Sequence, residues 1–178
     1  MMLQEDMIRF LSDFLPPMMT RRHGSAYLDL IGQNDNSTTT PTGKIGEYIS
    51  ATVASGSAVS LSNNTPANVT SISLTPGDWD VWVNGYFNGG ATTTVGNLIV
   101  SISTTSATLN TANGNLAVSQ ENNELIFGGS GQSLNTGAVR ISLAATTTVY
   151  FVAQAGFAVD TATAYGIIQA RRRRMYPG

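Results

Sequence analysis

The sequence contains no cysteine, a single histidine and few charged residues, and these shortages limit what the protein can do. Without cysteine there is neither a disulfide framework nor a thiolate metal site. The single histidine, His23, rules out a metal site built from several histidines and argues against a catalytic triad. Charged residues make up 11% of the chain, compared with roughly 25% in a typical globular protein. We therefore expect a protein that is not an enzyme and that binds no metal or cofactor.

Long apolar runs and a strong net charge are also missing. No segment reaches the roughly 18 apolar residues that a membrane-spanning helix needs, and the N-terminus, MMLQED, is acidic where a secretion signal is basic. The formal net charge of -2 gives no general attraction to nucleic acid. We expect synthesis in a cytoplasm without export, no membrane insertion and no nucleic-acid partner.

What the sequence does contain, from residue 44 onward, is alternation of apolar and polar residues. The clearest example is TPGDWDVWVNGYF (75–87), in which a Pro-Gly turn leads directly into a strand. Trp79 and Val81 are expected to point into a core, and Trp82 and Tyr86 to the opposite face. Similar strand patterns occur at 44–53, 57–62, 69–74, 95–105, 139–143, 147–157 and 165–174. These roughly eight or nine strands without helices between them predict an all-β antiparallel sandwich of the jelly-roll type.

A different pattern precedes this body. Residues 2 to about 15 have the periodicity of a short amphipathic α-helix that ends at Pro16 and Pro17. Residues 16–43 contain many residues typical of linkers, so we divide the chain into an attachment arm, 1–43, and a jelly-roll domain, 44–178. The residues expected to anchor the arm form the apolar stripe of this helix: Leu3, Met7, Phe10, Leu11 and Phe14.

A helix of about four turns is marginally stable alone, so it needs a partner. We favour docking on a host structure or a helical seam between copies of the chain. One alternative is a helix that packs on its own domain. Another, weaker alternative is insertion into a membrane surface, because the polar face is acidic rather than basic.

Four segments of the body resemble a family of small virion proteins encoded by tailed bacteriophages and prophages. They are GKIGEYISATV (43–53), NNTPANVTSISLTPGDWDVWVNGYFNGG (63–90), VRISLAATTTVYFVAQAGF (139–157) and AYGIIQARRRR (164–174). The resemblance covers roughly residues 32–174 and is most specific in the Gly-Asp-Trp turn and the closing strand. The predicted strand layout is also similar to the trimeric jelly roll of tumour-necrosis-factor-like proteins.

This resemblance implies a structural protein of a phage virion, assembled in the host cytoplasm. The expected form is an exposed homotrimeric jelly roll attached to capsid or tail proteins through its N-terminal arm, as a capsid decoration or head fibre. The alternative is a tail-fibre module that recognises a bacterial surface glycan. A third class, a glycan-cleaving enzyme, requires paired acids in a cleft, and the sequence does not assemble such a pair.

The expected interface between subunits combines two aromatic residues, Trp82 and Tyr86, with two arginines of the closing run, Arg171 and Arg173. Arginine forms planar, bidentate pairs with carboxylates, so we expect these side chains to bind acids of a neighbouring subunit or of the shell. The alternatives are a solvated strand end with arginines on both faces and, more weakly, a nucleic-acid contact. Candidate partners for the arginines are Glu47, Asp78 and Asp80.

Three further candidates have simpler interpretations. Glu121 and Glu124 are two acids that we expect to be solvated in a loop rather than catalytic. Asp35 lies among Asn34, Asn36 and Ser37 and offers oxygen ligands, but it lacks the spacing of a calcium loop and indicates a turn. His23 follows two arginines and indicates a basic patch in the linker.

Overall fold

The computed structural model describes residues 40, 42–127 and 131–175 of the 178-residue chain. The predicted helix over residues 2–15, with its anchoring side chains, lies outside the described residues, as do His23 and Asp35. The described residues form ten β-strands and one short 3-10 helix. In chain order these are β1 (Tyr48–Val53), η1 (Ser55–Ser57), β2 (Val59–Leu61), β3 (Ala67–Leu74), β4 (Gly77–Gly89), β5 (Thr94–Ser103), β6 (Leu116–Ile126), β7 (Gln132–Asn135), β8 (Val139–Leu143), β9 (Thr147–Ala158) and β10 (Ala162–Met175).

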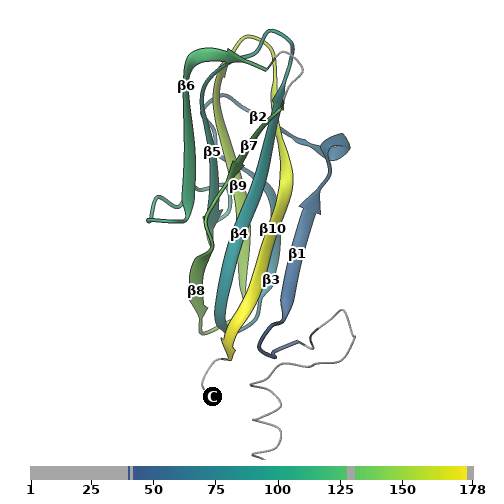
Figure 1. The fold of residues 1–178 in the computed structure, drawn as a ribbon, viewed down its shortest axis with the longest axis vertical. Coiled ribbons are helices and arrows are strands. Elements are labelled where there is room, and N and C mark those ends of the chain that lie inside the picture. The colour runs from purple at the N-terminus through teal and green to yellow at the C-terminus, as the bar shows by residue number, and fades with distance from the viewer. Residues whose placement is uncertain (1–39, 41, 128–130, 176–178) are drawn as a thin grey trace, which may run out of the picture.

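The strands form two antiparallel sheets that pack face to face as a β-sandwich (Figure 1). Sheet A has the order β1-β10-β4-β7, in which β2 also pairs with β10 and β8 also pairs with β4. Sheet B has the order β3-β9-β5-β6. The prediction of an all-β antiparallel sandwich is thus confirmed.

The inward faces of both sheets close a single apolar core. The alternation in β4 buries Trp79, Val81, Val83 and Phe87 completely, which confirms the predicted inward face of this strand. The apolar side chains that meet them from sheet B include Leu98, Val100, Ile102, Val149 and Phe151. Because buried apolar area contributes about 25 cal/mol per Å², these large side chains are the main stabilising element of the domain.

Two strands differ from the sequence expectation. Residues 116–126 lack regular alternation, yet they form β6 and pair with β5 along the edge of sheet B. Residues 132–135, QSLN, were not expected to be a strand, yet they form β7 and pair with β4. Both lie at sheet edges, where backbone hydrogen bonds to one neighbour are enough to hold a strand of weak pattern.

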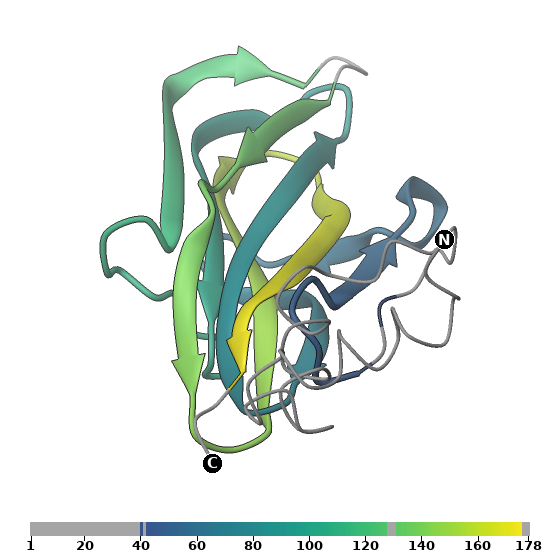
Figure 2. The same cartoon turned by 60° about the horizontal axis from the view of Figure 1, so that its bottom comes forward.

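The sandwich has two distinct ends, which we call the base and the top. The base is formed by residues 43–48, 75–80, 140–144 and 171–175, and it lies at the bottom of Figure 1, where β10 ends. The top is formed by residues 62–66, 88–94 and 156–162. Figure 2, in which the bottom of that view is turned forward, shows the base with the start of β1 beside the end of β10.

Candidate functional site

The most distinctive surface of the body is the outward face of sheet A. Trp82 and Tyr86 point outward from β4, and Tyr165 and Ile167 join them from β10, while Tyr48 contributes from β1. We call these five residues the outer aromatic face. Tyr48 and Tyr86 remain 48% and 43% exposed, so large aromatic rings face the solvent here. Trp82 and Tyr86 therefore lie where the sequence predicted, outside the core.

The outer aromatic face is internally ordered. The rings of Tyr86 and Tyr165, which are directly opposite each other across β4 and β10, stack with centroids 5.4 Å apart and an interplanar angle of 16°. The hydroxyl of Tyr48 donates a hydrogen bond of 2.7 Å to Oε1 of Gln169, the residue opposite Trp82. Such contacts hold the rings in fixed positions before any partner binds, which lowers the entropic cost of association.

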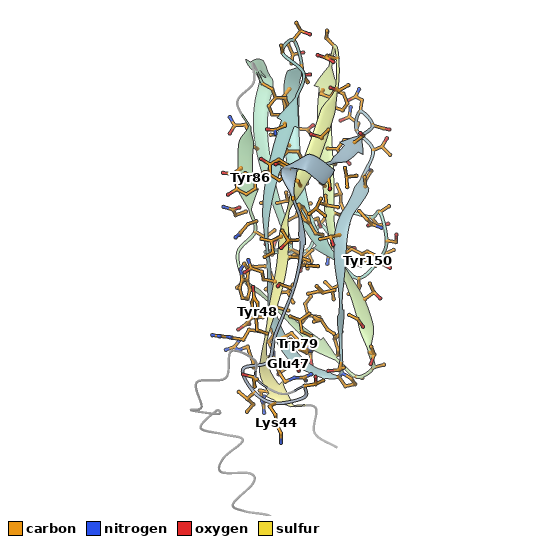
Figure 3. All side chains as sticks on the ribbon, turned by 90° about the vertical axis from the view of Figure 1, so that its right-hand side faces the viewer. Lys44, Glu47, Tyr48, Trp79, Tyr86 and Tyr150 are labelled. Atoms are coloured by element: carbon orange, nitrogen blue, oxygen red, sulfur yellow. The ribbon has the colours of Figure 1, made fainter. Side chains whose placement is uncertain are left out.

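The outward face of sheet B has a different character. Its exposed positions include the hydroxyl residues Ser71, Ser73 and Thr148, with the half-buried Tyr150 beside them and Val118 of β6 43% exposed. Figure 3 shows Tyr48 and Tyr86 on one side of the sandwich and Tyr150 on the opposite side. The exposed aromatic rings thus gather on sheet A, and an exposed apolar patch of this kind is typical of a surface that a partner covers.

At the base, the arginine run contains a residue that the sequence interpretation missed. Arg172 is 2% exposed, and its Nε lies 2.9 Å from Oε2 of Glu47, which is also buried. The same Glu47 oxygen accepts a 2.8 Å hydrogen bond from the backbone N–H of Gly43. Glu47, one of the predicted partners of Arg171 and Arg173, thus already pairs with a different arginine of its own chain, Arg172.

The other nitrogens of the Arg172 guanidinium also have hydrogen-bond acceptors. Nη1 donates to the carbonyl oxygen of Pro76 at 2.6 Å, and Nη2 donates to the hydroxyl of Thr75. The guanidinium carbon lies 4.2 Å from the centroid of the Trp79 ring, in cation–π contact. We call Arg172, Glu47 and Trp79 the base cluster. Figure 3 shows Glu47 and Trp79 close together just above Lys44 at the base.

Gly77 makes room for this cluster. Its φ of 142° is a conformation that favours glycine, and a Cβ there would lie 2.2 Å from Nη1 of Arg172. The alternation of β10 could have revealed the cluster, because Gly166, Ile168 and Ala170 all face inward and predict the same for Arg172.

The two arginines predicted at the interface are exposed but differ in their partners. Arg173 pairs with Asp80 of the same chain, with Nε 3.4 Å from Oδ2. Arg171 forms no ion pair within the described residues. Asp78 is likewise engaged within the chain, by Nη2 of Arg140 at 2.7 Å. Asp78 and Asp80 thus each have a cation of their own chain in reach, and the pairing of these acids with arginines of a neighbouring subunit stays a prediction.

A shallow polar depression occupies the top of the sandwich. Its volume is about 330 Å³, and its lining includes the amides of Asn63, Asn64 and Asn97 together with Phe157. A β-bulge interrupts β5 between Val95 and Asn97 at this point. Bulges are common where a side chain must be re-aimed for binding, and here the bulge carries Asn97 toward the depression.

The remaining predicted sites gain no support as catalytic or metal centres. Glu121 and Glu124 were expected in a loop, but the structure places their backbone in β6. Among the described residues, no three side chains of His, Cys, Asp or Glu are grouped so that they could hold a metal ion. In the same part of the chain, no helix is long and apolar enough to cross a membrane.

Comparison with known proteins does not assign the chain to a family. No protein-family model and no curated protein matches this sequence.

Proposed function

We propose that the protein is a non-enzymatic structural component of a tailed-phage virion, in which a homotrimeric jelly-roll body is attached to capsid or tail proteins by its N-terminal arm. The sequence resemblance supports the virion assignment. The observation that carries the proposal is the outer aromatic face of sheet A, on which the ordered rings of Tyr48 and Tyr86 are exposed.

The strand order supports the jelly-roll assignment. Since β1 and β2 both pair with β10, and β7 and β8 both pair with β4, sheet A has four strand positions, as sheet B does. A jelly roll has eight strands in two such sheets. The chain also alternates between the sheets in the manner of this fold, because β3, β5 and β9 join sheet B while β4, β7 and β10 join sheet A.

Trimer formation would cover the outer aromatic face. Aromatic residues are enriched in the buried centres of protein interfaces, where a large rigid ring buries much area at a low entropic cost. Trp82 and Tyr86 lie near the centre of this face, flanked by Tyr165 and Ile167. We assign these residues to contacts about the threefold axis, with Arg171 and the Arg173–Asp80 pair at the rim.

Attachment is assigned to the arm. The apolar stripe of Leu3, Met7, Phe10, Leu11 and Phe14 provides the anchoring surface for a capsid or tail partner. The described chain supports this direction of attachment, because residues 43–48, which follow the arm, are tied into the base by the hydrogen bond between Gly43 and Glu47.

Glycan recognition is the second candidate function, and the amide-lined depression at the top favours it. Asparagine amides offer both donors and acceptors, which suit sugar hydroxyls, and the ring of Phe157 lies beside them. The depression lies at the end of the body opposite the base, so it would remain accessible on an attached protein. Many symmetric copies would raise the avidity of a weak site of this kind.

The oligomeric state is the first test. Light scattering or sedimentation of the full chain at micromolar concentration should give the mass of three copies. A monomer under these conditions would refute the trimer.

The second test addresses attachment. A chain without residues 1–31 should keep the folded body, as judged by its circular dichroism spectrum, and should fail to be incorporated into phage particles. Normal incorporation of the truncated chain would contradict the assignment of the anchor, whereas loss of the folded spectrum would show that the arm belongs to the domain.

A further inference from the structure

The charges of the body are segregated along its long axis. Every lysine and arginine that follows residue 43 in the sequence lies in the base, namely Lys44, Arg140 and Arg171 to Arg174. Toward the top, Asp160 occupies the turn between β9 and β10. The backbone of residues 121–124 lies between the pairs Gln120–Asn97 and Leu125–Val95, next to the top. The basic residues of the body are therefore gathered at one end.

The base keeps an excess of accessible positive charge after its internal pairs are considered. Arg172 and Glu47 are buried and neutralise each other. Four arginines are left in the base, Arg140, Arg171, Arg173 and Arg174, against two acids, Asp78 and Asp80. Arg140 and Arg173, which pair with these acids, still have side chains 56% and 55% exposed. Each guanidinium therefore has donors available for a further partner.

The geometry of β10 concentrates these groups around a depression. A β-bulge between Arg172 and Arg174 leaves Arg173 and Arg174 both exposed, where strict alternation would have turned one of them inward. Together with Arg140 and Asp78, they line an open depression of about 290 Å³. Within the described residues Arg174 has no ion pair.

We propose that the base is a docking surface for an acidic protein, and that the depression receives a carboxylate side chain of that partner between Arg140, Arg173 and Arg174. Planar guanidinium groups match a carboxylate bidentately, and oppositely charged surfaces orient two proteins as they meet. The surface lies at the end of the body next to residues 42–44, where the arm joins. It therefore adds a second contact to the proposed attachment of the arm and orients the body with its top outward.

A protein partner fits this surface better than nucleic acid does. Asp78 and Asp80 lie among the arginines, and their carboxylates would repel a continuous row of phosphates. The formal net charge of the chain is also negative, so long-range attraction to DNA is weak. A protein can place a single carboxylate against the exposed donors of the arginines without presenting a continuous row of charge to Asp78 and Asp80.

The test uses the full chain and a fluorescently labelled peptide of twenty glutamates as the probe. Binding is measured by fluorescence anisotropy at low and at physiological salt. We expect wild type to bind the peptide and to lose affinity as salt rises, because the contacts are exposed. The triple variant Arg140→Gln/Arg173→Gln/Arg174→Gln should bind roughly 3- to 160-fold more weakly, the range given by three exposed ionic contacts of about 0.2–1 kcal/mol each.

The matched control changes the net charge equally at the other end. The control is the triple variant Ala91→Glu/Thr92→Glu/Val159→Glu, whose sites are exposed at the top. It adds three negative charges where the arginine variant removes three positive charges, so the two variants have the same net charge. At physiological salt the control should bind the peptide within about twofold of wild type, because its new charges lie at the opposite end of the sandwich and the Debye length is about 8 Å. Thermal unfolding of each variant verifies that the body remains folded.

A second variant separates charge from geometry. Arg140→Lys/Arg173→Lys/Arg174→Lys keeps the charge but loses the planar fork, so it should bind with an affinity between those of wild type and the glutamine variant. The proposal fails if the glutamine variant binds like wild type, or if the control at the top weakens binding as much. It also fails if a duplex DNA of the same total charge binds more tightly than the peptide. These results do not depend on phage particles, so the virion assignment can fail separately.

Discussion

Strand β4 carries a tryptophan on each of its faces, and β10 carries an arginine on each of its faces. In both strands the inward residue is buried and the outward residue is accessible. On the inward face, Trp79 and Arg172 are buried, and the arginine is neutralised by Glu47. On the outward face, Trp82 and Arg171 remain partly or fully accessible. The comparison shows that adjacent residues of one strand can serve folding and association separately, because successive side chains of a strand point to opposite faces.

The energetic consequences of the two faces differ. A buried ion pair pays a large desolvation cost, so removing one partner leaves an uncompensated charge and destabilises the fold strongly. An exposed pair such as Arg173 with Asp80 is screened by water and contributes little. Substitutions inside should therefore change the free energy of unfolding, whereas substitutions outside should change assembly.

The largest expected effect is at Arg172. Arg172→Met leaves the carboxylate of Glu47 buried without its cation, so we expect a loss of about 3–5 kcal/mol in the free energy of unfolding. Urea denaturation followed by circular dichroism measures it. The matched variant outside, Arg173→Met, should cost at most about 1 kcal/mol.

A double variant sharpens this result. Glu47→Leu/Arg172→Met removes both charges, so it should recover a large part of the stability lost by Arg172→Met alone. If Arg172→Met and Arg173→Met lowered the free energy of unfolding equally, the buried ion pair would contribute no more to stability than the exposed one.

The next effect concerns the two tryptophans. Trp82→Ser should weaken the proposed trimer while the body keeps its folded spectrum, because the ring lies on the outer aromatic face. Trp79→Ser, in the core, should cost about 3–5 kcal/mol of folding stability, as is usual when a buried aromatic side chain is truncated. Sedimentation and urea denaturation of both variants separate the two effects. A Trp82→Ser protein that remains trimeric at low micromolar concentration would exclude this face as the interface.

The smallest effect is a pH dependence at the base. The hydrogen bond from Arg140, followed by that from Ser142, holds the pKa of Asp78 below its ordinary value. A carboxyl group with a lowered folded pKa stabilises the protein above the ordinary pKa, and this stabilisation is lost as the pH falls through the folded pKa. The stability difference between wild type and Asp78→Asn should therefore be present at pH 7 and shrink in acid.

Urea midpoints at neutral pH and at about pH 3 measure this difference. Arg140→Gln is the control, because it removes the first cause of the shift and should raise the pKa of Asp78. A stability difference between wild type and Asp78→Asn that grows in acid would contradict a lowered pKa of Asp78 in the folded protein.

The sequence alone was sufficient for the fold class and for the faces of the best-patterned strands. Residues 75–87 alternate so regularly that the inward position of Trp79 and the outward positions of Trp82 and Tyr86 could be predicted, because strand side chains have a period of two. The same rule places Arg172 inward from Ile168 and Ala170. It fails at β7, QSLN, since an edge strand held by backbone pairing needs no apolar pattern.

The tertiary structure decided which charges meet. Glu47 and Arg172 are far apart in the sequence, and only the pairing of β1 with β10 brings them within 2.9 Å of each other. The bulge after Arg172 likewise depends on the register between β10 and β4, and it exposes both Arg173 and Arg174. Local pattern determines the direction of a side chain within its strand, but register and sheet order determine its neighbours, and those depend on contacts between distant segments.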